Sequence, residues 1–232
     1  MAPPKTKKLL IFGTGEIGSL ARFYFDHDSP YEVVGFTADD TFVSTREFQG
    51  LPLVPFSEVK KSFPPGEVDI HVALSYRKLN QVRAERYKAV KATGYQLASY
   101  LSSKSVFWNN LSVGENCLIL ENQTIQPGVD IGSNVMIWSG NHLGHESKIR
   151  DHAYISSHVC ISGHAEIGAY SFLGVNSAVK DFVKVGNEVF VTMGANVTKD
   201  VPDGSVVVGS AGSVYLSDSK AARSLKKKYF GL

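Results

Sequence analysis

The chain has 232 residues, a formal net charge of +2 at pH 7 and a hydrophobic content of 43%. Cationic and anionic residues are interspersed, which excludes the basic surface typical of nucleic-acid or membrane binding. No apolar stretch approaches the roughly 20 residues of a membrane span, and no apolar signal core follows the first eight residues. We therefore expect a cytoplasmic protein whose partners are small molecules.

The first hundred residues alternate predicted strands with predicted helices. The strands are predicted at 8–12, 31–37 and 69–74, and the helices at 19–25 and about 79–93. This alternation indicates a parallel sheet. We expect an α/β, Rossmann-like half domain over residues 1–105.

The glycine-rich turn after the first strand is typical of a phosphate site. Gly13 and Gly15 would let a phosphate approach backbone N–H groups at the start of the helix. Asp39 and Asp40 follow the second strand, where a dinucleotide-binding fold holds a ribose hydroxyl. This pattern alone suggests NAD, but about 100 residues supply only one mononucleotide half, which favours a nucleotide or nucleotide sugar. A turn used only for helix–strand packing is the remaining alternative.

From Val113 to Val197 every sixth residue is Val, Ile or Leu, fifteen in succession without an insertion. A period of six fits neither a helix nor an alternating strand. It indicates a β-solenoid in which each short strand points one aliphatic side chain into a shared core. Glycine often follows the aliphatic residue, as at Gly114, Gly144 and Gly168, and we expect these glycines to allow the corners. Residues 106–232 should therefore form an all-β solenoid domain.

The six-residue register ends after Val197. A proline- and glycine-bearing loop occupies residues 200–204, and a last strand is predicted at 206–209. A short C-terminal helix is predicted at 217–230, with three lysines near its end, where cations suit the helix dipole. We expect this helix to be a solvated cap of the solenoid.

Five of the seven histidines lie between residues 142 and 164. His152, His158 and His164 occupy the same slot of successive repeats, so they lie on three different sides of a triangular coil. We expect them at solvated corners, where they cannot converge within one subunit. His145 occupies another slot and is followed by Glu146. An imidazole beside a carboxylate makes a general base, provided that the corner turns Glu146 towards His145.

A zinc site is the alternative use of these histidines. Carbonic anhydrases of β-solenoid architecture place two zinc ligands five residues apart, and no histidine pair here has that spacing, so we expect no metal. Cys117 and Cys160 lie inside repeats and lack paired metal-ligand spacing. They are expected to be buried free thiols.

Several segments together resemble the bacterial nucleotide-sugar acyltransferases of the left-handed β-helix superfamily. They are the continuous hexapeptides, the half domain with its Asp pair, and residues 140–149, 161–164 and 173–177. In pattern the chain is similar to N-acetyltransferases of nucleotide-linked 4-amino-4,6-dideoxysugars and to sialic acid O-acetyltransferase-like proteins. The resemblance covers nearly the whole chain. It implies a left-handed parallel β-helix after the α/β half domain, and a role in cell-surface polysaccharide biosynthesis.

The resemblance also implies a homotrimer with each active site between two subunits. The family's His-Glu pair falls on His145 and Glu146, with the histidine removing the proton as the sugar amine attacks the thioester of acetyl-CoA. The glycine whose N–H supports the thioester oxygen falls on Gly163. Acetyl-CoA contacts carry over to Val175, Met193 and Tyr154, which stands where some relatives have a histidine. Nucleotide contacts carry over to Gly13, Gly15, Glu16, Asp39, Asp40 and Ser75, although Glu16 and Ser75 depart from the residues common in relatives.

The leading hypothesis is therefore N-acetylation of a nucleotide-linked amino sugar by acetyl-CoA. The enzymatic alternative is O-acetylation of a sialic acid or another sugar hydroxyl, because a His-Glu pair does not distinguish an amine from a hydroxyl. A non-catalytic solenoid for assembly or sugar sensing is the alternative from another class, and an NAD-dependent enzyme is a third. A contact between the C-terminal lysines and the CoA phosphates remains open beside the solvated cap.

Overall fold

The N-terminal domain is a five-stranded sheet flanked by helices, as the alternating pattern predicted. The structure, a computed structural model, describes residues 3–231. The strand order is β3-β4-β2-β1-β5, with β3 antiparallel to β4 and the other pairs parallel. The strands are β1 (Lys7–Phe12), β2 (Tyr31–Ala38), β3 (Glu47–Phe48), β4 (Leu51–Pro55) and β5 (Asp69–Val72). The helices are α1 (Glu16–Asp28), α2 (Val59–Ser62) and α3 (Gln81–Ala92), with short 3-10 turns η1 (Asp40–Phe42) and η2 (Phe56–Glu58).

Strand β1 is apolar on both faces because both faces of the sheet are covered. Leu9 and Ile11 pack in one cluster with Phe25 of α1. Leu10 and Phe12 pack in a second cluster on the other face, with residues of α2 and α3. A continuous apolar run is what a strand buried on both faces requires.

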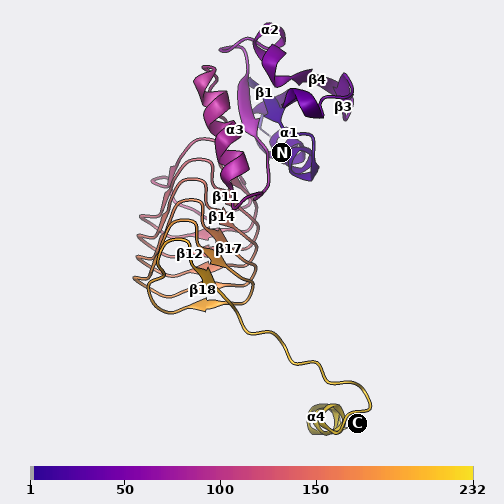
Figure 1. Ribbon diagram of the computed structural model, residues 1–232. Helices are drawn as coiled ribbons and strands as arrows, with labels where there is room; N and C mark the ends of the chain where they lie inside the picture. The colour runs from indigo at the N-terminus through magenta and orange to yellow at the C-terminus, as the bar shows by residue number, and fades with distance from the viewer. Residues whose placement is uncertain (1–2, 232) are drawn as a thin grey trace.

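The second domain is a stack of triangular coils (Figure 1). Each strand is two residues long and pairs in parallel with the strand 18 residues further on, so three hexapeptides complete one coil. The strands are β6 (Tyr100–Leu101), β7 (Ser112–Val113), β8 (Leu118–Ile119), β9 (Thr124–Ile125), β10 (Asp130–Ile131), β11 (Met136–Ile137), β12 (His142–Leu143), β13 (Lys148–Ile149), β14 (Tyr154–Ile155), β15 (Cys160–Ile161), β16 (Glu166–Ile167), β17 (Phe172–Leu173), β18 (Ala178–Val179), β19 (Lys184–Val185), β20 (Phe190–Val191), β21 (Asn196–Val197) and β22 (Val206–Val207).

The strands form three faces, which we name after one strand of each. The β12 face contains β9, β12, β15, β18 and β21, and the β13 face contains β7, β10, β13, β16 and β19. The β14 face contains β6, β8, β11, β14, β17, β20 and β22. Since β6 pairs with β8, solenoid pairing already begins at Tyr100, before the predicted second domain.

The aliphatic ladder is the core of the solenoid. Val113 is partly buried, and the other fourteen positions of the six-residue series lie in one buried cluster. The sequence pattern missed a second inward position, two residues before each aliphatic residue, where small residues such as Ala153 and Ala165 are buried. Each repeat therefore contributes two inward side chains instead of one.

The expected role of the glycines at the corners was wrong in one respect. Gly144 and Gly168 are needed for close approach between coils, since a Cβ on Gly144 would lie 2.5 Å from the N atom of Gly163. The left-handed backbone conformation falls two residues later, at non-glycine residues such as Glu146 (φ 57°) and His164 (φ 59°). Asparagine, histidine and aromatic residues occupy that position on many coils, where the corner itself holds the strained conformation.

The expectation of two buried thiols was half right. Cys117 is buried, whereas Cys160 is exposed. Cys160 is the first residue of β15 and points outwards, because consecutive side chains of a strand lie on opposite sides. Its neighbour Ile161 takes the core position.

The C-terminal arm leaves the end of the stack (Figure 1). After β22 it runs without strands to α4 (Lys220–Phe230), where Ser219 caps the first turn by accepting a hydrogen bond from the Ala222 N–H (3.1 Å). The last strand and the terminal helix are thus confirmed, with the helix starting three residues later than predicted. Within residues 3–231 no helix is long and apolar enough to cross a membrane.

Candidate active site

His145 lies at the corner between β12 and β13, and its backbone is held on both sides. Its N–H donates to Oε1 of Gln126 (2.8 Å), and its carbonyl accepts from the His164 N–H (2.8 Å). The imidazole lies over Gly163 of the following coil, where a Cβ would come within 2.6 Å of Nε2. The ring therefore packs on the next coil while the residue stays exposed to solvent.

Glu146 points the opposite way along the stack. Its backbone is left-handed (φ 57°), and its carboxylate lies beside Gly128 of the preceding coil. No hydrogen bond joins it to the imidazole of His145 in the part of the chain that the structure describes. The corner turns Glu146 out of the strand direction, but not onto His145 of the same chain.

Three corner amides suit the acyl-group and coenzyme contacts implied by the resemblance. Among residues 3–231 no acceptor receives a hydrogen bond from the backbone N–H of Gly163, Val175 or Met193. An unpaired amide has a strong tendency to bind a carbonyl oxygen. Gly163 lies on the β12/β13 corner below His145, whereas Val175 and Met193 lie on the β14/β12 corner. The three amides therefore flank the β12 face from its two edges.

A pocket of about 410 Å³ lies between the N-terminal domain and the β14 face. It brings together Gly15, Glu16 and Ser75, expected to bind the nucleotide end of the substrate, and Tyr154, expected to contact acetyl-CoA. Tyr154 is 4% exposed, and its hydroxyl accepts a hydrogen bond from Nε1 of Trp138. Burial raises the pKa of Tyr154 to about 12, so the phenol remains protonated at neutral pH.

The glycine-rich turn holds the start of α1 open towards this pocket. Gly13 has φ 128°, and a Cβ on it would lie 2.6 Å from the Ala73 carbonyl oxygen. Gly15 occupies the N-cap of α1 without a side-chain cap, so the first N–H groups of the helix are available to an anion. The turn therefore combines close packing against β5 with an open helix N-terminus.

Asp39 and Asp40 lie at the end of β2 and already have partners. Asp39 forms an ion pair with Nε of Arg86 (2.9 Å). Asp40 accepts hydrogen bonds from the Ser57 hydroxyl (2.7 Å) and the Ser57 N–H (3.2 Å), which hold the pKa of Asp40 below its usual value. Neither residue lines the pocket that contains Gly15 and Ser75.

Tyr76, Trp138 and Arg83 belong to this region and were missed from the sequence. Tyr76 and Trp138 line the pocket, and the Tyr76 ring lies 5.2 Å from that of Tyr154. Arg83 of α3 is 2% exposed, and its guanidinium carbon lies 5.8 Å from the centre of the Tyr154 ring. Burial lowers the pKa of Arg83 to about 10, so the side chain stays charged.

A period of 18 residues could have identified the covered face. The outward position of the β14 face is apolar on every coil, at Tyr100, Leu118, Met136, Tyr154, Phe172 and Phe190. The outward positions of the β13 face are instead polar or charged, at Ser112, Asp130, Lys148, Glu166 and Lys184. An outward apolar row predicts a face covered by another part of the protein.

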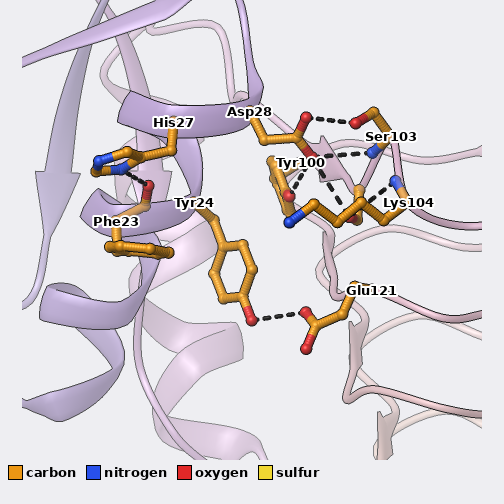
Figure 2. Close-up of a pocket in the computed structure, with 9 residues that line it drawn as sticks. Phe23, Tyr24, His27, Asp28, Tyr100, Ser103, Lys104 and Glu121 are labelled. Atoms are coloured by element: carbon orange, nitrogen blue, oxygen red, sulfur yellow. Dashed lines mark hydrogen bonds between the residues drawn. The ribbon is translucent and has the colours of Figure 1, made fainter. Parts of the chain in front are cut away.

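A second pocket, of about 550 Å³, lies where α1 meets the first coils, and Figure 2 shows its lining residues. Tyr24 donates to Glu121 (2.6 Å), and Asp28 accepts from the Tyr100 hydroxyl (2.7 Å) and the Ser103 N–H (2.9 Å). Burial alone would raise the pKa of Asp28, but these hydrogen bonds hold it below its usual value. The polar groups of this pocket pair with one another across the two domains, and none of the predicted site residues lies there.

The other repeat histidines separate as predicted. His152, His158 and His164 lie on three different corners, each with a left-handed backbone. His152 is not solvated as expected, because α3 covers its corner: it is 6% exposed and pairs with Asn134 (2.9 Å). Within residues 3–231 no group of three or more His, Cys, Asp or Glu side chains is arranged to hold a metal ion.

No protein-family model and no curated protein sequence matches the chain. Solved structures do match it. The acetyltransferase domain of PglB from Neisseria gonorrhoeae, in complex with acetyl coenzyme A, is 22% identical with a TM-score of 0.75, covering 87% of this chain and 95% of that one. PerB from Caulobacter crescentus, in complex with CoA and GDP-perosamine, is 18% identical with a TM-score of 0.75, covering 90% of this chain and 100% of that one.

WeeI from Acinetobacter baumannii is a third match, 23% identical with a TM-score of 0.54, and the alignment covers 88% of this chain and 97% of that one. At these identities the likeness concerns the fold. It confirms the predicted class, an α/β half domain followed by a parallel β-helix, and it extends over nearly the full length of the matched proteins.

Proposed function

We propose that this protein transfers the acetyl group of acetyl-CoA to the amino group of a nucleotide-linked amino sugar. The observation that carries the proposal is the division of the predicted residues between an exposed histidine with an adjacent free amide and a separate pocket at a glycine-rich turn. The first arrangement suits acyl transfer, and the second suits a nucleotide sugar. Structures of similar fold hold acetyl-CoA in one case, and CoA with GDP-perosamine in another.

The proposed site lies between subunits of a homotrimer. In one chain His145 lies on the β12/β13 corner, which is opposite the β14 face that carries the pocket. A triangular coil cannot bring that corner to its own opposite face. A second copy can present its β12/β13 corner to the pocket and to the amides of Val175 and Met193. A closed ring of three copies repeats this contact three times.

The chemistry follows from these positions. The sugar amine attacks the thioester carbonyl carbon while Nε2 of His145 removes a proton from the amine nitrogen. A C–N bond forms, the negative charge that develops on the carbonyl oxygen is stabilised by the Gly163 N–H, and the C–S bond then breaks to release CoA as the thiol. The imidazole must be neutral to accept the proton.

The N-terminal pocket supplies the binding energy that positions the amine. Its open α1 N-terminus at Gly15 suits a phosphate, and Tyr76, Trp138 and Tyr154 offer ring surfaces to a sugar. Binding of the remote nucleotide holds the amine against the thioester and reduces the entropic cost of the reaction.

The proposal is tested by following thiol release from acetyl-CoA against a panel of UDP-, GDP- and dTDP-linked amino sugars, with sialic acid and NAD as comparison ligands. We expect turnover with at least one nucleotide-linked amine, and a loss of about a hundredfold or more in kcat for His145→Ala. Turnover of sialic acid alone would favour O-acetylation, and equal rates for His145→Ala and the native protein would favour a non-catalytic role for this corner.

Complementation tests the placement of the site between subunits. The variant His145→Ala lacks the base, and Ser75→Arg fills the pocket with a large side chain. If each site uses two subunits, mixed oligomers of these two inactive chains regain part of the native activity. Mixed oligomers that remain inactive would contradict the shared site, with light scattering confirming that the chains have mixed.

A further inference from the structure

The imidazole of His145 has no hydrogen-bonding side chain to orient it within its own chain. Among residues 3–231 neither ring nitrogen is in hydrogen-bond contact, and the carboxylate of Glu146 lies towards the preceding coil. The ring is nevertheless placed over Gly163 of the following coil. Its orientation must therefore come from packing.

Two further rings continue the packing of His145 down the same corner. The His164 ring meets the His145 ring edge to face, with centroids 4.9 Å apart and an interplanar angle of 89°. Phe182 lies flat under His164, at 4.8 Å and 5°. His164 and Phe182 occupy the same corner position on successive coils, so the three rings form a ladder along the edge of the solenoid.

The backbone couples this ladder to the candidate site. The His164 N–H donates to the carbonyl of His145 (2.8 Å), and the Phe182 N–H donates to the carbonyl of Gly163 (3.1 Å). Each ring of the ladder therefore follows from a backbone bonded to one of the two residues that the proposed reaction uses. A displacement of His164 would be felt by the ring of His145 from the side and by its backbone.

We propose that His164, held by Phe182, is a positioning residue that fixes the ring orientation of the base His145; this inference rests on the proposed function. The edge-to-face contact restricts rotation of the His145 ring, and the flat contact with Phe182 restricts His164. Phe182 is 70% exposed, so its ring adds little to the core of its own chain. Its position under His164 gives this exposed ring a role that burial does not.

Matched substitutions at residue 164 separate the ring from its chemistry. His164→Asn removes the ring but suits the left-handed corner, since asparagine already occupies the equivalent position at Asn134 and Asn176. His164→Phe keeps a flat ring, and phenylalanine is tolerated there because Phe182 adopts the same conformation (φ 64°). We expect His164→Asn to lower kcat by about tenfold or more with little change in either KM, and His164→Phe to retain most of the native kcat. Phe182→Asn should resemble a weaker His164→Asn.

Two results would overturn the proposal. One is a native kcat in His164→Asn, and the other is an equal loss in His164→Phe, which would show that the imidazole of His164 acts chemically. Melting temperatures of the variants identify any loss due to unfolding.

Crystal structures of the two variants test the same idea without an activity. We expect an ordered His145 ring over Gly163 in His164→Phe, and a rotated or multiply oriented ring in His164→Asn. An unchanged His145 ring in His164→Asn contradicts positioning even if no acceptor substrate is ever found. Absence of acyl transfer in the native protein, by contrast, contradicts the proposed function alone.

Discussion

The imidazole of His145 occupies the space that a side chain on Gly163 would need. A Cβ at position 163 would lie 2.6 Å from Nε2 and 2.8 Å from Cε1 of His145. Contacts of that length are not tolerated, so the ring must move when the glycine is replaced. Glycine at 163 thus places the candidate base and leaves an amide free beneath it.

Gly163→Ala should therefore reduce activity without unfolding the protein. The methyl group displaces only the far end of one exposed side chain, so we expect a melting temperature within a few degrees of native. We expect kcat for acyl transfer to fall about tenfold to a hundredfold, because the base moves relative to the thioester. Gly212→Ala is the control, since a Cβ there meets no atom within 4 Å. Equal activity of the two variants would mean that Gly163 has no part in the reaction.

Tyr76→Ala should weaken binding of the nucleotide sugar selectively. Tyr76 is 51% exposed and lines the pocket beside Tyr154, so its removal opens one wall with little effect on folding. We expect KM for the sugar to rise about tenfold, with KM for acetyl-CoA changed by less than about twofold. Tyr215→Ala is a matched control, because Tyr215 is 53% exposed and lies on the C-terminal arm. A parallel rise in both KM values would show that the pocket does not separate the two substrates.

The fold could be predicted because its signal repeats. Each hexapeptide restates the same inward aliphatic position, and the apolar run of β1 indicates a strand covered on both faces. The candidate site is harder, because its residues come from positions 18 residues apart or from two domains. His145 and Glu146 are adjacent in sequence, yet their side chains point to opposite neighbouring coils. The direction of a side chain at a left-handed corner depends on the stack, which no local pattern specifies.

The burial of two histidines predicts a loss of stability in mild acid. Burial lowers the pKa of His71 and of His152 to about 4, each below the usual 6.5. Between pH 6.5 and 4 the unfolded chain therefore binds more protons than the folded chain, so the free energy of unfolding falls as the pH falls and is constant above about pH 7.

His152→Asn should remove part of this pH dependence. Asparagine suits the corner, as Asn134 shows one coil earlier, and it cannot gain a proton. Urea unfolding from pH 4.5 to 7.5 measures the effect, which we expect to be roughly 1 to 2 kcal/mol less loss over this range than in the native protein. His27→Asn, on exposed surface of α1, is the control and should leave the pH dependence unchanged. A steeper acid loss in His152→Asn would contradict the assignment.

Arg83 predicts a strong mechanical link between the two domains. Its guanidinium donates to the carbonyls of Asn134 (3.3 Å), His152 (2.9 Å) and Ala153 (3.3 Å) on the solenoid, from a helix of the N-terminal domain. Arg83→Met keeps much of the side-chain volume but leaves these buried carbonyls without their donor. We expect the free energy of unfolding to fall by at least about 3 kcal/mol, because hydrogen bonds to a buried charged group are among the strongest in a protein. Arg83→Lys should lie between the two, since an ammonium cannot reproduce the planar fork of donors. Arg223→Met, on the exposed helix α4, should change stability by less than about 0.5 kcal/mol. Urea unfolding monitored by both Trp fluorescence and far-UV circular dichroism gives the comparison, and equal stability of Arg83→Met and Arg223→Met would show that the solenoid carbonyls do not depend on this arginine.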